Sequence, residues 1–330
     1  MNMKPVALTL GEPAGIGGEI SLKAWQTLRD ELPFFLIADA AHMQSLANQS
    51  GTPIKIITTP DQAAAAMPAA VPILDHPLPA PVNAGVPSAQ NAAEVVAMIE
   101  RAMRLTTSGQ ACALTTNPIH KRALQEGAGF AFPGHTEYLA SLANVTRPVM
   151  MLSAPELRVV PVTIHIAVNQ IHEILTADLL EQTIRVTHTA MIDDLGIPAP
   201  RIAVAGLNPH AGEYGAMGSE EIDFISPTLD KLRAEGMTLL GPMSADTMFH
   251  AAARERYDLA LCMYHDQALI PIKTLNFSAG VNTTLGLPFI RTSPDHGTAF
   301  DIVGQNRADA LSLTEALRTA LKMARHRGTT

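Results

Sequence analysis

Short apolar runs alternate with amphipathic segments along most of the chain. The apolar runs lie at 5–10, 34–40, 54–59, 111–116, 202–207 and 259–264. Between them, 88–105, about 176–195 and the end of the chain from about Ala308 repeat apolar residues at the spacing of a helix. Strands that alternate with helices are typical of βαβ units around a parallel sheet. The pattern therefore predicts an α/β fold.

One stretch breaks the alternation. Residues 148–165, PVMMLSAPELRVVPVTIH, look like two strands joined at Ser153-Ala154-Pro155, which predicts a hairpin and hence an antiparallel part of the sheet. A proline-rich surface crossing occupies 72–87, and the sequence contains no flexible linker and no internal repeat. Two interconnected halves are therefore favoured over two tandem domains.

The composition of the chain favours a globular protein and argues against several kinds of partner. With 330 residues, 47% of them hydrophobic and 16% charged, the chain has the composition of a compact globular protein. The net charge of −8 and the absence of a Lys/Arg run argue against nucleic acid or an anionic membrane as partner. The two cysteines lie inside apolar runs, and the N-terminus lacks the features of a signal peptide, so we expect a cytoplasmic protein with no membrane span.

Three histidines stand at the exits of apolar runs. His165 ends VVPVTIH, His210 follows RIAVAGL by three residues, and His265 follows LALCMY directly. Ligands of α/β proteins bind at the carboxyl ends of the strands, and three imidazoles with an open position are typical of catalytic metal sites. The spacing matches no local ligand motif, and among twelve histidines some reach strand ends by chance. A three-histidine metal site and ordinary surface histidines therefore both remain open.

Several other residues suit an anionic ligand or its chemistry. Lys273 and Arg291 end apolar segments, where each could hold a phosphate or carboxylate or simply extend into solvent. Asn282 could add a hydrogen bond, and His135-Thr136 starts a predicted helix, where an anion or a plain N-cap would fit. Asp266, next to His265, is a candidate to orient that histidine or to act as a base.

The glycine-rich stretch GEPAGIGGEI, 11–20, does not match the dinucleotide fingerprint of a Rossmann fold. Ile20 occupies the position of the third glycine. The glycines still indicate a close approach of this backbone to a ligand or to a neighbouring element.

Seven motifs together resemble one family, the 4-hydroxythreonine-4-phosphate dehydrogenases of pyridoxal phosphate biosynthesis. They are GEPAGIGGE (11–19), TNPIHK (116–121), PGHTEYLA (133–140), NPHAGE (208–213), ADTMF (245–249), MYHDQALIPIK (263–273) and GVNTTLGLPFIRTSPDHGTA (280–299). They occur in order over nearly the whole chain, so the resemblance is far more specific than a single motif.

The resemblance implies a fold like that of isocitrate and isopropylmalate dehydrogenases, with two α/β/α subdomains, a mixed, largely parallel sheet and a cleft between the subdomains. We expect the first subdomain to comprise 1–130 plus about 295–330, and the second about 131–294, which carries most of the metal and substrate residues. It also implies a homodimer with the active site at the subunit interface.

The resemblance further assigns roles to residues. The matching metal ligands are His165, His210 and His265, and the matching substrate contacts are His135, Thr136, Lys273, Asn282 and Arg291. DHGTAFD resembles the cofactor loop of the wider superfamily, which implies that Asp295, His296, Gly297, Thr298 and Asp301 bind NAD or NADP. The metal would be Zn, Co or Mg.

The implied reaction oxidises the C3 hydroxyl of 4-phosphooxy-L-threonine, a phosphorylated hydroxy amino acid, and then decarboxylates it to 3-amino-2-oxopropyl phosphate. Asp266 and Lys273 are the catalytic candidates for accepting the hydroxyl proton. Two alternatives remain: a dehydrogenase of threonate or erythronate 4-phosphate, and a non-redox metal hydrolase or acyl-phosphate transferase on a similar fold.

Overall fold

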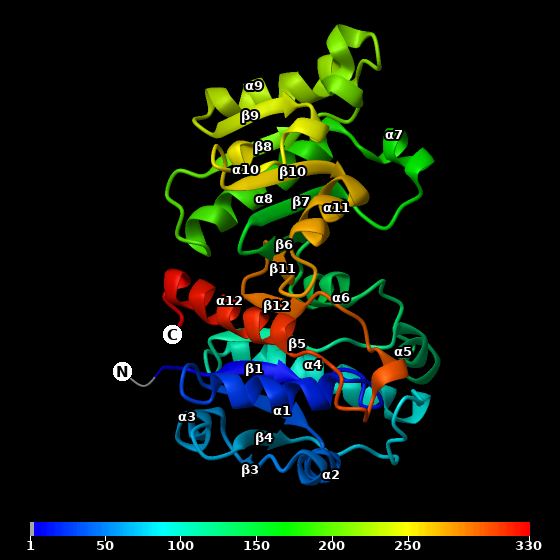
Figure 1. Ribbon diagram of the computed structural model, residues 1–330, viewed down its shortest axis with the longest axis vertical. Helices are drawn as coiled ribbons and strands as arrows, with labels where there is room; N and C mark the ends of the chain where they lie inside the picture. The colour runs from blue at the N-terminus through cyan, green and yellow to red at the C-terminus, as the bar shows by residue number, and fades with distance from the viewer. Residues whose placement is uncertain (1–2) are drawn as a thin grey trace. The chain divides into compact units, whose positions relative to one another are not determined.

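The computed structural model describes residues 3–330, which divide by their contacts into two compact units. Of the described residues, unit 1 comprises 3–144 and Leu287–Thr330, and unit 2 comprises Val145–Gly286. Each unit contains six strands of the sheet order, covered by helices (Figure 1). The two-subdomain α/β class expected from the sequence is confirmed.

Unit 1 is built on strands in the order β3-β4-β2-β1-β5-β12, and the pairs from β3 to β12 are parallel. The strands are β1 (Val6–Thr9), β2 (Phe34–Ala38), β3 (Ile54–Ile57), β4 (Val71–Asp75), β5 (Ala113–Thr116) and β12 (Arg291–Pro294). The helices are α1 (Gly17–Leu28), α2 (Ala40–Ser50), α3 (Ala63–Ala66), α4 (Ala92–Thr107), α5 (Lys121–Ala128), α6 (His135–Leu142) and α12 (Leu311–Arg327), with short turns η1 (Pro60–Gln62), η2 (Ala89–Asn91) and η7 (Phe300–Ile302).

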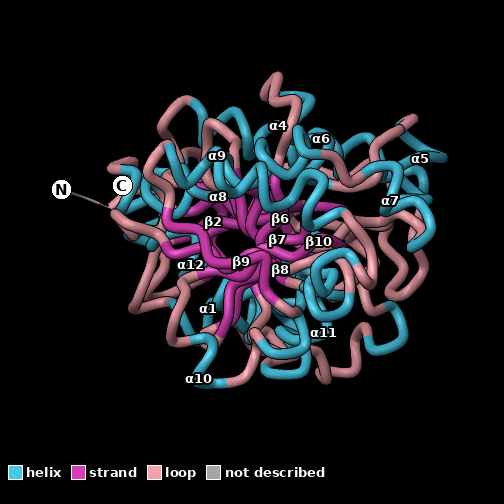
Figure 2. Tube along the Cα trace, turned by 90° about the horizontal axis from the view of Figure 1, so that it is seen from above, coloured by secondary structure: helices cyan, strands magenta, loops and turns pink. Residues whose placement is uncertain are grey.

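The central strands of unit 1 are buried on both faces, which explains their continuous apolar sequence. Phe34 and Phe35 on β2 are fully buried, one on each side of the sheet. Helices α1 and α12 cover one face and α4 covers the other (Figure 2). Truncating either phenylalanine to alanine would therefore cost about 3–5 kcal/mol.

Unit 2 has the strand order β11-β6-β7-β10-β8-β9. Its strands are β6 (Val149–Ala154), β7 (Leu157–Thr163), β8 (Arg201–Ala205), β9 (Thr238–Met243), β10 (Leu259–Tyr264) and β11 (Val281–Leu285). Its helical segments are η3 (Val168–Gln170), α7 (Ile171–Ile174), α8 (Ala177–Asp193), η4 (Pro209–Gly215), η5 (Glu221–Ile225), α9 (Ser226–Ala234), η6 (Ala245–Thr247), α10 (Ala251–Arg254) and α11 (His265–Leu275).

The expected hairpin is present in unit 2. Strands β6 and β7 pair antiparallel with Ala154 opposite Leu157, and β6 also pairs antiparallel with β11. Strands β7, β10, β8 and β9 are parallel, so the mixed, largely parallel sheet is confirmed. Helices α8 and α9 lie on one face and α10 and α11 on the other (Figure 2).

Two segments that the sequence analysis assigned to the second subdomain belong to unit 1. The hydroxyl of Tyr138 on α6 donates to Glu100 on α4 at 2.7 Å, and its ring packs on Phe130 and Phe132. Arg291 starts β12, which pairs with β5. Because these contacts are made by residues 131–144 and 287–294, the division falls at 144/145 and 286/287.

A second difference concerns the stretch after His265, which the sequence suggested was a short apolar segment ending in Lys273. It is the helix α11, which starts at His265 and carries Lys273 in its last turn, with Pro271 in its interior. Within residues 3–330 no helix has the length and apolar character that crossing a bilayer requires.

Candidate active site

The three histidines follow three neighbouring parallel strands of unit 2. His265 comes directly after β10, the central strand of the three, while His165 lies two residues beyond β7 and His210 five residues beyond β8. The strands are adjacent in Figure 1, and because they are parallel their carboxyl ends meet at one edge of the sheet. The expected strand-end placement of these residues is therefore present.

Two of these histidines are close enough to share a ligand. The rings of His165 and His265 have their centres 5.9 Å apart, and both line a pocket of about 200 Å³ with Thr163 and Asp266. Two imidazoles on one tetrahedral ion with metal–nitrogen bonds of about 2.1 Å would have ring centres roughly 5 Å apart. The pair thus fits a divalent metal after a small adjustment.

Asp266 determines which nitrogen of His265 would face such an ion. The Nδ1 atom of His265 lies 2.7 Å from Oδ1 of Asp266. A carboxylate on one ring nitrogen fixes the tautomer and leaves Nε2 as the ligand atom, as in many zinc sites.

His210 lies on a strained loop. From His210 to Tyr214 the backbone is left-handed, with φ between 42° and 79°. Non-glycine residues pay roughly 1–2 kcal/mol each for this conformation. Among the residues that the structure describes, no group of three or more His, Cys, Asp or Glu side chains is close enough to hold a metal.

The loops that carry these histidines are held by side chains that the sequence analysis missed. Glu221, 3% exposed, accepts the backbone N–H of Asn208 at 2.8 Å, beside the His210 loop. Gln267 accepts the N–H of Met263 at 2.7 Å and donates to the carbonyl of Gly206 at 2.8 Å, which ties the His265 turn to the end of β8. A polar residue on an amphipathic helix gives no sequence signal for such a role.

The other substrate candidates of unit 2 lie on α11 and β11. The Lys273 ammonium is 5.7 Å from the centre of the Phe277 ring, which is within the range of a cation–π contact. Asn282 lies on β11, and its side-chain Oδ1 is buried without a hydrogen-bond partner among residues 3–330. A buried acceptor of this kind fits a ligand that brings a donor.

In unit 1, Arg291 and His135 are brought together. Arg291 is 3% exposed, and its Nη2 donates to the hydroxyl of Thr116 at 2.7 Å. Burial lowers the pKa of Arg291 to about 10, with Glu137 acting in the opposite direction. Burial also lowers the pKa of His135 well below 6.5, helped by the charges of Arg291 and Lys121. His135 and Thr136 form the first turn of α6, and the N-terminal end of a helix favours an anion.

The predicted cofactor residues form a loop of unit 1 that packs on the glycine-rich stretch. The N–H of Ile16 donates to the carbonyl of Thr298 at 3.1 Å, and a β-carbon on Gly15 would lie only 3.0 Å from that oxygen. Asp295 is anchored by its N–H to Ser312 on α12 at 3.0 Å. The glycines therefore allow close packing of these two loops.

The rest of the loop bears a buried acceptor and an aromatic contact. The Nδ1 of His296 lies 3.0 Å from the carbonyl of Gly297, and its Nε2 is buried without a partner in the described part of the chain. Asp301 lies in η7 next to Phe300, whose ring meets His120 edge-on at 5.3 Å.

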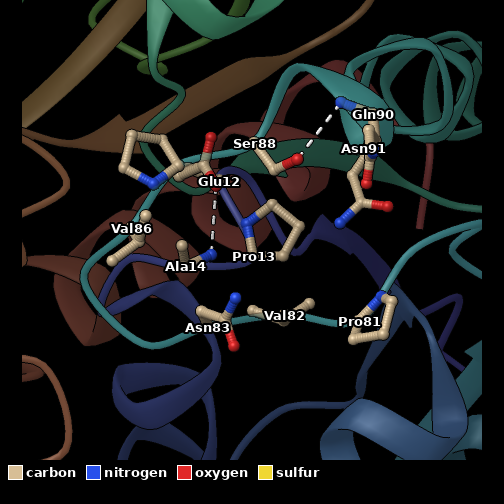
Figure 3. A pocket seen from close by; sticks show the side chains of 11 residues that line it. Glu12, Pro13, Ala14, Pro81, Val82, Asn83, Val86, Ser88, Gln90 and Asn91 are labelled. Carbon is tan, nitrogen blue, oxygen red and sulfur yellow. Dashed lines mark hydrogen bonds between the residues drawn. The ribbon is translucent and has the colours of Figure 1, made fainter.

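A pocket of about 300 Å³ lies beside this loop in unit 1 (Figure 3). Its polar lining comes from Glu12, Asn83, Ser88, Gln90 and Asn91, and neither lysine nor arginine lines it. Glu12 is 4% exposed and accepts the N–H of Ala14 at 3.1 Å. Burial raises the pKa of Glu12, while the Ala14 N–H and His120 lower it. Such a lining suits a neutral group with hydroxyl or amide donors, and disfavours a phosphate.

Comparison with known proteins gives one consistent result. The family model described as pyridoxal phosphate biosynthetic protein PdxA matches residues 30–320. The 4-hydroxythreonine-4-phosphate dehydrogenase of Ruegeria sp. (strain TM1040) is 53% identical over 322 residues, covering 98% of this chain and 97% of that protein. The enzyme of that name from Paracoccus denitrificans (strain Pd 1222) is 53% identical over 328 residues, covering 98% and 99%.

A solved structure of the same family is also similar to this chain. The crystal structure of 4-hydroxythreonine-4-phosphate dehydrogenase from Klebsiella pneumoniae has a TM-score of 0.88 and 38% identity, and the match covers 98% of this chain and 99% of that one. The resemblance drawn from the seven motifs is confirmed over the full length, together with the fold.

Proposed function

Because the chain belongs to the PdxA family of pyridoxal phosphate biosynthetic proteins, we propose that it is a 4-hydroxythreonine-4-phosphate dehydrogenase. It would oxidise C3 of 4-phosphooxy-L-threonine by hydride transfer to NAD or NADP, and loss of carbon dioxide from the β-keto acid would give 3-amino-2-oxopropyl phosphate. The observation that carries this proposal is the 53% identity over 98% of the chain to a relative of that name.

His165, His210 and His265 would hold a divalent metal, Zn, Co or Mg. The 5.9 Å separation of the His165 and His265 rings and the Asp266 contact support this assignment. When bound, such an ion supplies Lewis-acid polarisation of the oxygen on the reacting carbon. Asp266 orients His265, and Asp266 and Lys273 remain the two candidates for accepting the hydroxyl proton.

The anionic ends of the substrate would be held by Arg291, His135, Thr136, Lys273 and Asn282. The buried guanidinium of Arg291 suits bidentate contact with a phosphate or carboxylate. The buried Oδ1 of Asn282 suits the amino group, because an ammonium brings the donor that this acceptor lacks.

The cofactor would bind along Asp295, His296, Gly297, Thr298 and Asp301. The adjoining pocket around Glu12, with no cationic lining, suits a neutral ring of that cofactor that carries hydroxyl or amide groups. Cys112 and Cys262 are both buried free thiols, as suits the cytoplasm, where we propose that the protein acts.

We further propose a homodimer whose second copy completes the active site. Large apolar side chains are exposed on three segments that carry site residues: Val168, 77% exposed, Tyr214, fully exposed, and Phe277, 77% exposed. They follow His165, His210 and Lys273 by three or four residues. A second copy would cover them.

A rate comparison tests the substrate. The purified protein with NAD and metal should turn over 4-phosphooxy-L-threonine with a higher kcat/KM than threonate or erythronate 4-phosphate. The reverse order would assign the protein to sugar-acid phosphates. Absence of nicotinamide reduction with all three would contradict a dehydrogenase and favour the non-redox hydrolase or transferase.

A further inference from the structure

Three basic side chains of unit 1 converge at the start of α6. Arg291 enters from β12, His135 is the first residue of α6, and Lys121 is the first residue of α5. The Cε atom of Lys121 lies 3.9 Å from the point that a β-carbon on Gly134 would occupy. Gly134 is the N-cap of α6, so the lysine side chain reaches the same helix end as His135.

His135 is buried close to both of these cations. Its pKa is lowered well below 6.5 by burial and by the positive charges of Arg291 and Lys121. At neutral pH the ring is uncharged, and its Nε2 is buried with no hydrogen-bond partner among residues 3–330. A buried polar atom without a partner in a native protein calls for an explanation, and a bound ligand is one.

Two positive charges act on His135, those of Arg291 and Lys121. The Glu137 carboxylate acts on Arg291, and its Oε2 lies 3.5 Å from the same β-carbon point on Gly134. A substrate phosphate, with a charge of about −1.5 to −2, would interact favourably with both cations and with the N-terminal end of α6.

Lys121 differs from the basic residue next to it. Arg122 makes a 2.7 Å ion pair with Glu126 one turn along α5, on the solvent side of the helix. The side chain of Lys121 makes no hydrogen bond and no ion pair with any residue from 3 to 330. Both side chains are exposed, but only Lys121 lies close enough to His135 for its charge to act on that ring.

We propose that Lys121 is a further substrate-binding residue, whose ammonium group completes a phosphate site with His135 and Arg291 at the N-terminus of α6. This inference rests on the proposed function, because the phosphate is that of the proposed substrate. Lys121 would bind and position the phosphate, and it takes no part in proton or hydride transfer.

The test compares Lys121→Ala and Lys121→Arg with Arg122→Ala, the matched control from the same helix turn. In steady-state assays, Lys121→Ala should raise the KM for the phosphorylated substrate by about tenfold or more, because a charge-assisted contact is lost. Its kcat and its KM for NAD should change less than about twofold, and Lys121→Arg should recover most of the loss. Arg122→Ala should match the wild type.

A second measurement separates this inference from the proposed function. Binding of inorganic phosphate to the metal-free protein is followed by calorimetry, which needs no turnover. Weaker binding in Lys121→Ala than in Arg122→Ala supports the phosphate site even if the substrate were misassigned. Equal phosphate affinity and equal substrate KM in the two variants would overturn the role of Lys121 while leaving the dehydrogenase intact. Matching circular dichroism spectra and melting temperatures exclude a folding defect.

Discussion

Glu12 shows how a single buried carboxyl can make stability depend on pH. Burial raises the pKa of Glu12 above its ordinary value of 4.5, and the Ala14 N–H and His120 only partly oppose the shift. The folded protein therefore holds this proton more tightly than the unfolded chain does. The group contributes its full stability below about pH 4.5 and loses it as the pH rises through the raised pKa.

Glu12→Gln should remove this titration. We expect the melting temperature of the variant, relative to the wild type, to rise between about pH 4 and about pH 8, because only the wild type must bury a charged carboxylate at the higher pH. Thermal unfolding of both proteins across that range measures it. A difference that stays constant with pH would show that the carboxyl is not shifted.

His265→Ala tests the proposed metal ligand whose ring lies 5.9 Å from that of His165. We expect a loss of turnover of at least about a hundredfold with the fold retained, because the ion would lose a direct ligand. In a zinc titration followed by calorimetry, the variant should bind zinc more weakly than the wild type. His188→Ala is the control, since His188 lies on α8 away from the strand ends. Unchanged zinc affinity in His265→Ala would remove this residue from the site.

The loop η4 has strained backbone conformations next to His210. Ala211 has φ 51° and ψ 45°, a left-handed conformation that glycine adopts without cost. Ala211→Gly should therefore stabilise the protein by about 1 kcal/mol. Ala216→Gly, in the right-handed region at φ −71°, is the matched control and should destabilise slightly. Urea unfolding measures both, and equal destabilisation by the two changes would contradict a left-handed loop.

Most elements could be predicted from periodicity, and the exceptions have physical causes. Helix α8 and the hairpin β6–β7 match their predicted positions, because their apolar spacing is unambiguous. Helix α11 was missed because Ala268 and Ile272, its buried residues one turn apart, lie in a short apolar run that contains Pro271. The period of so short a run does not distinguish a strand from a helix.

The candidate site residues could also be predicted only in part. The strand-end positions of His165, His210 and His265 could be predicted, because a histidine that follows an apolar run is visible in the sequence. The left-handed backbone at His210 could not, since alanine, glutamate and tyrosine in NPHAGEYG carry no signal for positive φ. The roles of Glu221 and Gln267 depend on contacts between distant segments, which periodicity does not encode.

For the whole molecule, the proposed dimer makes a prediction about the fully exposed Tyr214. The wild type should sediment as a dimer, and Tyr214→Asp should shift it toward monomer, because a charge would have to be buried in the interface. Ile56→Asp is the control, since Ile56 is also exposed, at 60%, but lies on the edge strand β3 of unit 1. A monomeric wild type in sedimentation velocity would contradict the dimer.

A single assay tests whether the protein carries out metal-dependent hydride transfer. Chelator-treated protein is mixed with 4-phosphooxy-L-threonine and NAD, and absorbance at the reduced-nicotinamide wavelength is followed before and after addition of Zn, Co or Mg. Absorbance should stay flat without metal and rise once metal is added. A rise of equal rate in the metal-free protein would contradict the metal site, and a flat trace in every condition would contradict the dehydrogenase.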